Sequence, residues 1–80
     1  MIKTVVINEK SFLYLKNRNL VPQYKKAKNY IVSGYAFLVS LKLREPKKKG
    51  IYYFRINKQY RAFALLEDNV LKVFHIDDHS

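Results

Sequence analysis

The apolar pattern of the last part of the chain is the feature that most constrains the fold. Three apolar-rich runs occupy residues 51–56, 60–66 and 70–76, and two short polar segments, 57–59 and 67–69, separate them. The runs show a period of two, which is typical of strands, because successive side chains of a strand point to opposite faces of its sheet. The sequence therefore predicts a three-stranded antiparallel meander with two three-residue loops.

Upstream of this meander, the sequence predicts one strand and one short helix. The β-branched run at residues 3–7 (KTVVI) favours a strand, since such side chains pack well on a pleated surface. Asn8 follows directly and is a good N-cap residue, so a short helix is expected from Glu9 to about Asn17.

A second helix is expected to begin near Pro22, which suits a first helical turn. Its apolar stripe has helical spacing through Tyr24, Ala27, Ile31, Tyr35 and Leu38. The alternative is a hairpin with strands at 30–32 and 35–37 that turns at Ser33-Gly34. Residues 44–50 (REPKKKG) are polar and end on glycine, so they predict a loop that leads into the meander.

Length and composition limit the class of protein. The 80 residues suffice for a single domain, residues 1–80, and the predicted elements make it an α+β fold. The lack of cysteine excludes a disulfide scaffold, a cysteine-ligated zinc site and thiol chemistry. The longest uncharged run, Asn29–Leu41, is 13 residues and too short to span a bilayer. We therefore expect a cytoplasmic protein with no membrane partner.

Positive charge is concentrated in the body of the chain. Residues 10–61 hold ten lysines and four arginines against one acid, Glu45, and the whole chain carries a formal net charge of +10. Residues 62–80 hold one lysine against four acids. An aromatic fraction of 15% excludes a disordered basic tail. A folded, aromatic-rich polycation points to a phosphate backbone, or an acidic protein that mimics one, as its partner.

The meander sorts its side chains onto two faces. With three-residue loops, Arg55 lies opposite Arg61, and Arg61 lies opposite His75. One face is then expected to join the core, and it collects Phe54, Ile56, Ala62, Phe74 and Ile76. The other face collects Tyr53, Arg55, Arg61, His75, Asp77 and His79.

Two arginines directly opposite each other should destabilise a strand pair by repulsion. A phosphate bound between Arg55 and Arg61 would remove that penalty, because guanidinium groups hold phosphate with two parallel hydrogen bonds. The alternative is that Arg55 pairs with an acid, Asp77 or Glu45, and that Arg61 stacks on Tyr53.

The two histidines of this face favour proton transfer over metal binding. Imidazole exchanges protons near neutral pH, and both rings are expected beside the arginines. A metal site is the weaker interpretation of His75 and His79 with Asp77 between them, because the sequence offers no third strong ligand elsewhere. We therefore predict no metal at this face.

At this point the residues resemble a known family. The segment at residues 54–63 (FRINKQYRAF) is similar to the strand–turn–strand signature of the RelE/ParE toxin superfamily, and most similar to its HigB-like branch. The ending at residues 76–79 (IDDH) resembles the Asp-Tyr-His that closes that branch. The likeness covers about residues 41–79, and it implies the RelE-like, microbial-RNase-like α+β fold.

The resemblance also implies a function. Members of this branch are toxins of type II toxin–antitoxin pairs, and most are ribosome-dependent endoribonucleases, or mRNA interferases, which use no metal or other cofactor. In that reaction the 2′-OH of the RNA attacks the adjacent phosphate. The implied partners are a cognate antitoxin protein, mRNA and the ribosome.

The resemblance also implies roles for individual residues, those at positions that match the family's motif. Arg55 and Arg61 match the arginines that hold the scissile phosphate, His79 matches the terminal histidine, and Asp77 matches the acid before it. The resemblance assigns RNA binding to the basic loop residues Lys47, Lys48 and Lys49, with Tyr53 and His75 on the same face as the arginines.

One residue departs from the family pattern. Asp78 stands where the branch usually has tyrosine, and an aspartate can neither stack on a base nor attract phosphate. Two other functions therefore remain open. One is a non-catalytic toxin of the same fold that poisons DNA gyrase by contact. The other is a small structural RNA-binding protein whose aromatic side chains stack on bases.

Overall fold

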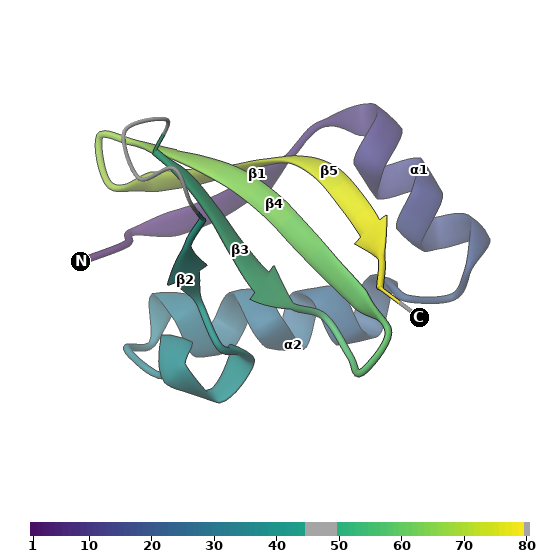
Figure 1. Cartoon of the computed structure of the whole chain (residues 1–80), viewed down its shortest axis with the longest axis horizontal. Coiled ribbons are helices and arrows are strands. Elements are labelled where there is room, and N and C mark those ends of the chain that lie inside the picture. The colour runs from purple at the N-terminus through teal and green to yellow at the C-terminus, as the bar shows by residue number, and fades with distance from the viewer. Residues whose placement is uncertain (45–49, 80) are drawn as a thin grey trace.

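Residues 1–44 and 50–79 are described by the computed structural model, in which a five-stranded sheet carries its helices on one face (Figure 1). The elements are β1 (Thr4–Ile7), α1 (Glu9–Asn17), α2 (Val21–Val32), the 3₁₀ helix η1 (Ala36–Val39), β2 (Lys42–Leu43), β3 (Ile51–Arg55), β4 (Tyr60–Glu67) and β5 (Val70–Asp78). The strand order is β1-β5-β4-β3-β2. The expected α+β fold, with two helices before an antiparallel meander, is confirmed.

The two edges of the sheet come from strands whose places the sequence did not indicate. β1 pairs in parallel with β5, so the N-terminal strand extends the sheet beyond the meander. β2 is only two residues long and pairs antiparallel with β3, which sets Lys42 opposite Tyr53. The loop predicted to begin at residue 44 is therefore preceded by a short strand that brings a lysine to the sheet.

The helices begin as expected, but the second one ends early. The Asn8 side-chain carbonyl accepts the Ser11 N–H at 2.9 Å, which confirms it as the N-cap of α1. The predicted stripe through Tyr35 and Leu38 is wrong, because α2 stops at Val32 and the chain turns at Gly34 with φ +89°. Glycine adopts this left-handed backbone without a Cβ penalty, so it ends the helix. The alternative hairpin is also wrong, since η1 follows the turn.

The first hairpin has the predicted register. Arg55 lies opposite Arg61, and the Ile56 N–H donates to the Tyr60 carbonyl at 2.9 Å across a three-residue loop. Within that loop the Asn57 side-chain carbonyl accepts the N–H groups of Gln59 and Tyr60, at 2.8 and 2.9 Å. This Asx turn replaces the backbone bonds that the loop cannot make, so it stabilises the register.

The second hairpin corrects the predicted register. Its loop has two residues, Asp68 and Asn69, both with positive φ (51° and 65°), and Glu67 pairs with Val70. This backbone is the one that tight hairpins prefer, and Asp and Asn tolerate it. A bulge between Phe63 and Ala64 then shifts the pairing once more. Arg61 therefore lies opposite Asp77, not opposite His75.

The same bulge removes one residue from the predicted core. Phe74 is the extra residue of the bulge and is 41% exposed, so its predicted burial is wrong. The other predicted core residues of the meander are buried, namely Phe54, Ile56, Ala62 and Ile76. They join Val5 of β1 and the buried side chains of α1 and α2 in one cluster. The opposite face of the sheet thus carries side chains that lie outside this core cluster. None of the described helices is long and apolar enough to cross a membrane.

Tyr24 of α2 is the one tyrosine among the described residues that belongs to the buried core. Its hydroxyl has no hydrogen-bond partner among these residues, and burial raises the pKa of the phenol from 10.0 to about 12. The folded state therefore keeps this proton at pH values where the unfolded state has lost it. The resulting stability is complete below pH 10 and is lost as the pH rises towards 12.

Tyr24→Phe removes this dependence. At pH 7 we expect a free energy of unfolding equal to or above that of the wild type, because the substitution deletes a buried hydroxyl without a partner. Between pH 7 and pH 11 the variant should lose about 1 kcal/mol less than the wild type. Urea unfolding at both pH values measures the difference. Tyr35→Phe, at an exposed ring, controls for the loss of a hydroxyl, and parallel profiles for wild type and Tyr24→Phe would contradict the expectation.

Candidate functional site

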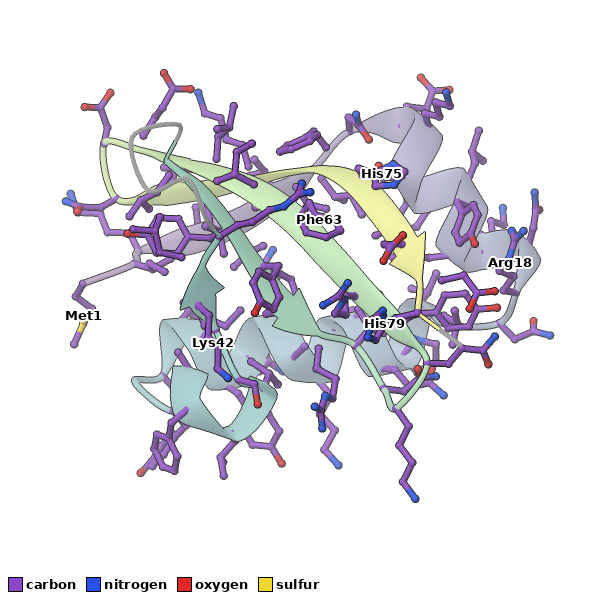
Figure 2. The ribbon with its side chains drawn as sticks, in the orientation of Figure 1. Met1, Arg18, Lys42, Phe63, His75 and His79 are labelled. Carbon is purple, nitrogen blue, oxygen red and sulfur yellow. The ribbon has the colours of Figure 1, made fainter. Side chains whose placement is uncertain are left out.

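The face of the sheet that lies opposite the described helices carries a cluster of cationic and aromatic side chains. The pairing of β3, β4 and β5 sets Tyr53, Phe63 and His75 in one row and Arg55, Arg61 and Asp77 in the next. Lys42 of β2 adds to the first row. Figure 2 shows Lys42, Phe63 and His79 on the side of the sheet that faces the viewer. The strand pairing thus brings together side chains that are up to 37 residues apart in sequence, since Lys42 and His79 are its outermost members.

Arg61 lies at the centre of this cluster and is held by three groups. Its Nη2 donates to the Asp77 carboxylate at 3.2 Å. Its guanidinium lies 5.2 Å from the centroid of the Tyr53 ring and 5.6 Å from that of Phe63. Its Nε is buried and has no hydrogen-bond partner among the described residues. Arg61 therefore has a fixed position at the wall of the cluster, and its Nε is not accessible from solvent.

Phe63 forms the aromatic floor of the cluster. It is buried although it lies outside the main core, because other side chains cover it. The Tyr53 ring lies 5.9 Å away, the His75 ring stacks at 6.0 Å, and the Arg44 guanidinium lies 5.1 Å from its centroid. Such cation–π and ring contacts fix the orientation of the charged groups around Phe63.

Two adjoining pockets open on this face. The first, of about 150 Å³, is lined by Ser40, Lys42, Tyr53, Arg55, Lys58, Arg61 and His79. The second, of about 280 Å³, shares Tyr53 and Arg61 with it and is completed by Leu43, Arg44 and Phe63. Four cationic side chains and one imidazole surround the first pocket, and no acidic side chain of the described residues lines it. Its chemistry therefore suits an anion such as a phosphodiester.

The C-terminal residues are tied to the loop between β3 and β4. The His79 N–H donates to the Gln59 carbonyl at 2.6 Å, and the Gln59 amide donates to the Asp78 carboxylate at 3.0 Å. These bonds hold the imidazole of His79 at the edge of the pocket, although it is the last residue described. The same loop supplies Lys58 to the pocket wall.

Most of the predicted site residues lie on one face of the sheet, but their contacts with one another differ from those predicted. Arg55, Arg61, His79 and Tyr53 line one pocket, while Asp77 binds Arg61 from outside it. Arg61 both stacks on Tyr53 and takes the acidic partner that the alternative interpretation gave to Arg55. His75 stacks on Phe63 and lies apart from the first pocket. The predicted RNA-binding lysines Lys47, Lys48 and Lys49 lie outside the described residues.

Sequence reasoning missed several residues of the pocket. Lys42 and Ser40 precede the meander, and only the pairing of β2 with β3 brings them to it. Ser40 ends η1 with φ 54°, a backbone that a turn imposes and that no sequence period signals. Lys58 was assigned to a loop, where its position between Arg55 and Arg61 in the sequence could have suggested a role. Within residues 1–44 and 50–79, no three side chains of the metal-binding types come together.

The pocket predicts a measurable affinity for inorganic phosphate. Arg61→Gln removes a charged donor that is already oriented, so phosphate affinity should fall about ten-fold, as expected for hydrogen bonds to charged groups. Arg18→Gln is the matched control, because Arg18 stacks on Tyr14 of α1, away from the pocket. An NMR titration with phosphate at low salt measures both variants. Equal losses in the two would assign the binding to net charge rather than to the pocket.

The fold agrees with that of known toxin structures. No family model matches the chain, and no curated protein matches its sequence. Two solved structures of the YoeB–YefM toxin–antitoxin complex from Staphylococcus aureus match it with a TM-score of 0.70 each, at 17% and 18% identity, over the whole of both chains. YoeB is a toxin of the RelE family. The protein therefore has the RelE-like toxin fold that its sequence resemblance implied.

Proposed function

We propose that this protein is the toxin of a type II toxin–antitoxin pair and that it cleaves mRNA on the ribosome. The observation that supports this most strongly is the pocket in which Lys42, Arg55, Lys58 and Arg61 surround one space with His79 at its edge. This set supplies what phosphodiester cleavage needs, namely fixed positive charge and an imidazole that can donate or accept a proton. The YoeB-like fold supports the same assignment.

The reaction is an internal transfer within the RNA. The 2′-oxygen forms a bond to the adjacent phosphorus, its proton passes to a base, and the bond from phosphorus to the 5′-oxygen breaks as that oxygen gains a proton. The products are a 2′,3′-cyclic phosphate and a 5′-OH. Because the nucleophile belongs to the substrate, the protein has only to orient the phosphate, stabilise its added negative charge and move two protons.

The arginines and His79 take distinct roles in this proposal. Arg61 binds the phosphate with its fixed guanidinium, and the exposed Arg55 closes on it from the neighbouring strand. The bound phosphate offsets the repulsion between the two side chains. His79 carries out one of the two proton transfers, since its imidazole lines the pocket and can both donate and accept a proton. Asp77 is a positioning residue, because it contacts Arg61 and does not line the pocket.

The positive charge of the protein also indicates its partners. A protein with a net charge of +10 is expected to bind an acidic antitoxin when it is not bound to RNA. The matched YoeB structures are complexes with the antitoxin YefM. On the ribosome, the cationic face would lie against the mRNA backbone, with Tyr53 beside the bases. No metal or organic cofactor takes part in the proposed reaction.

Arg61→Ala tests the catalytic role. We expect loss of mRNA cleavage on programmed ribosomes by at least about 100-fold, because the substitution removes the charge that stabilises the transition state. Arg18→Ala should keep full activity, and circular dichroism should show both variants folded. Primer extension locates and quantifies the cuts. Unchanged cleavage by Arg61→Ala would remove this residue from the site.

Asp78→Tyr tests the departure from the family pattern. Asp78 accepts a hydrogen bond from Gln59 and lies next to His79, where its negative charge opposes the approach of a phosphate. The tyrosine variant should cleave several-fold faster in the same assay, because a ring can stack on a base at this position. A loss of activity would show that the site depends on the bond between Asp78 and Gln59, and Gln59→Ala would then lose activity to the same degree.

A further inference from the structure

A hollow of about 250 Å³ lies between α1 and the last part of β5. β1 pairs with β5 only as far as Val73, and α1 packs against β5 beyond the end of that pairing. We refer to this space as the α1 hollow. It shares no lining residue with either pocket of the candidate site. Its walls are formed by Lys10, Ser11, Tyr14, Phe74, His75 and Ile76.

The bulge in β5 sets the exposed ring of Phe74 beside the α1 hollow. Phe74 is the unpaired residue of the bulge and is 41% exposed. Asn8 holds this bulge from the start of α1, because its backbone N–H donates to the Val73 carbonyl at 3.1 Å and its side-chain amide donates to the Phe74 carbonyl at 3.3 Å. Bulges next to functional sites commonly redirect a side chain. The backbone that carries the Phe74 ring is therefore fixed before any ligand binds.

His75 connects the α1 hollow to the candidate site. Its exposed ring lines the hollow and stacks on Phe63 of β4 at 6.0 Å. Tyr53 packs on the same ring from the other neighbouring strand, at 5.9 Å. Figure 2 shows His75 on the side of Phe63 that lies towards α1. Surface rings on both sides of the buried Phe63 thus lead from the reaction pocket to the α1 hollow, as in proteins that bind single-stranded RNA.

The α1 hollow lies far enough from the reaction pocket to hold a flanking nucleotide. Asp77 lies opposite Arg61, and Phe74 lies three residues before Asp77 on β5. With about 3.3 Å per residue and about 4.8 Å between strands, the backbones of Arg61 and Phe74 are roughly 11 Å apart. An RNA strand whose phosphate contacts Arg61 therefore places a neighbouring base, not the base at the cleaved bond, beside Phe74.

The side chains of the α1 hollow suit a nucleobase and its phosphate. Phe74 and Tyr14 supply aromatic surface, and Lys10 supplies a cation. The Tyr14 ring is held by the Arg18 guanidinium, 3.5 Å from its centroid. No acidic side chain of the described residues lines the hollow, so nothing in its walls repels a phosphate.

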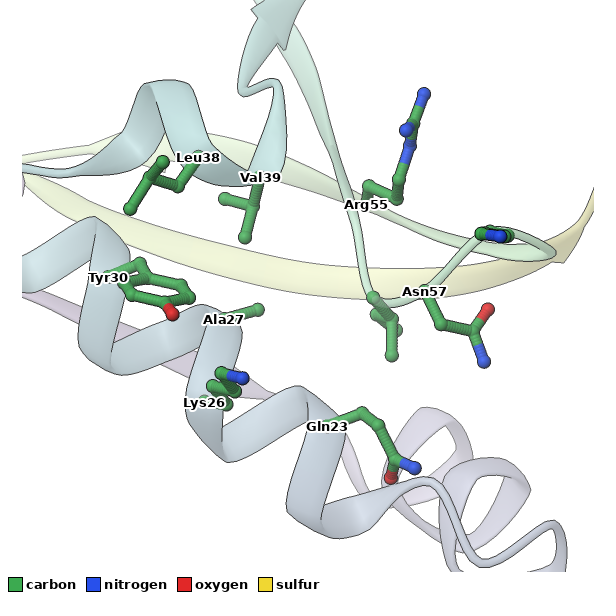
Figure 3. Close-up of a pocket in the computed structure, with 10 residues that line it drawn as sticks. Gln23, Lys26, Ala27, Tyr30, Leu38, Val39, Arg55 and Asn57 are labelled. Carbon is green, nitrogen blue, oxygen red and sulfur yellow. The ribbon is translucent and has the colours of Figure 1, made fainter.

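A larger hollow, of about 370 Å³, has different chemistry. It lies between α2, η1 and the loop that joins β3 to β4, and Figure 3 shows Ala27, Leu38 and Val39 around it. These aliphatic side chains offer no ring on which a base can stack. Phe37 of η1 is 71% exposed but is not one of its lining residues. Phe37 therefore provides a control for the loss of an exposed phenylalanine outside the α1 hollow.

We infer that the α1 hollow binds an unpaired base that flanks the scissile phosphate on the same RNA strand, with the base stacked on Phe74 and a backbone phosphate on Lys10. The inference rests on the proposed function, because it assumes that the reaction pocket holds a phosphodiester of that strand. It adds a substrate contact that the reaction chemistry itself does not use.

Equilibrium binding to a single-stranded heptanucleotide RNA tests the stacking. Methylation of every 2′-OH removes the nucleophile, so the RNA stays intact. Phe74→Ala should weaken binding about ten-fold, as expected for the loss of one stacked base, and Phe74→Tyr should stay within about two-fold of the wild type because it keeps a ring. Phe37→Ala should change binding less than about two-fold. Equal effects of Phe74→Ala and Phe37→Ala, or no binding by the wild type, would overturn the inference.

Versions of the same RNA that each lack one base show whether Phe74 contacts a base. Removal of a base keeps the charge of the backbone. At one position the removal should weaken binding to the wild type about ten-fold and binding to Phe74→Ala less than about two-fold, because the two changes delete the same contact. Equal losses in both proteins at every position would show that Phe74 stacks on no base.

A lysine pair tests the phosphate contact. Lys10→Gln should weaken binding of the heptanucleotide about five-fold more than Lys16→Gln, which removes the same charge from the same helix outside the hollow. Equal losses in the two variants would assign the effect to net charge and refute the contact with Lys10.

Cleavage on programmed ribosomes separates this inference from the proposed function. Phe74→Ala should lower cleavage about ten-fold when the protein is limiting, and the deficit should shrink as the protein concentration rises, because the variant loses a binding contact. Cleavage by the wild type together with normal RNA binding by Phe74→Ala would overturn the subsite and leave the proposed function intact. Weaker RNA binding by Phe74→Ala in a protein that cuts no mRNA would refute the proposed function and support the base contact.

Discussion

The Asx turn at Asn57 is the interaction on which the rest of the site depends. Its side-chain carbonyl accepts two backbone N–H groups and holds a three-residue loop. That loop length places Arg55 opposite Arg61, since one residue more or less would turn one of them to the buried face. The same loop binds the C-terminal residues through Gln59 and places Lys58 in the wall of the first pocket. One short turn thus sets the positions of the two arginines and of the His79 imidazole.

Repulsion between Arg55 and Arg61 lowers the stability of the fold, and the side chains that contact them offset this only in part. Like charges opposite each other on a sheet are unfavourable, and Asp77 neutralises just one of the two arginines. The ion pair is about a third exposed, so it contributes at most about 1 kcal/mol. Packing of Arg61 against Tyr53 and Phe63 adds to this, but Arg55 remains exposed. An arrangement of this kind is expected where an anionic ligand completes the electrostatics.

Local chemistry made much of the structure predictable. The meander, the N-cap at Asn8 and the facing arginines follow from strand period, capping and loop length, which act over a few residues. The end of α2 at Val32 was missed because the apolar stripe continues past Gly34, whose left-handed backbone turns the chain. The bulge at Phe74 and the pairing of Lys42 with Tyr53 depend on tertiary contacts, so no local signal marks them. The partner of Arg61 changed from His75 to Asp77 because of this bulge together with the two-residue loop at Asp68 and Asn69.

The most direct test of the central claim is the end chemistry of mRNA cut on programmed ribosomes, with a chelator present. The account predicts cuts that appear only when this protein and ribosomes are both present, with a 2′,3′-cyclic phosphate on one fragment and a 5′-OH on the other. These ends would show that the 2′-oxygen of the RNA is the nucleophile, as the proposed reaction requires. Fragments with a 5′-phosphate, or uncut mRNA with a folded protein, would contradict it.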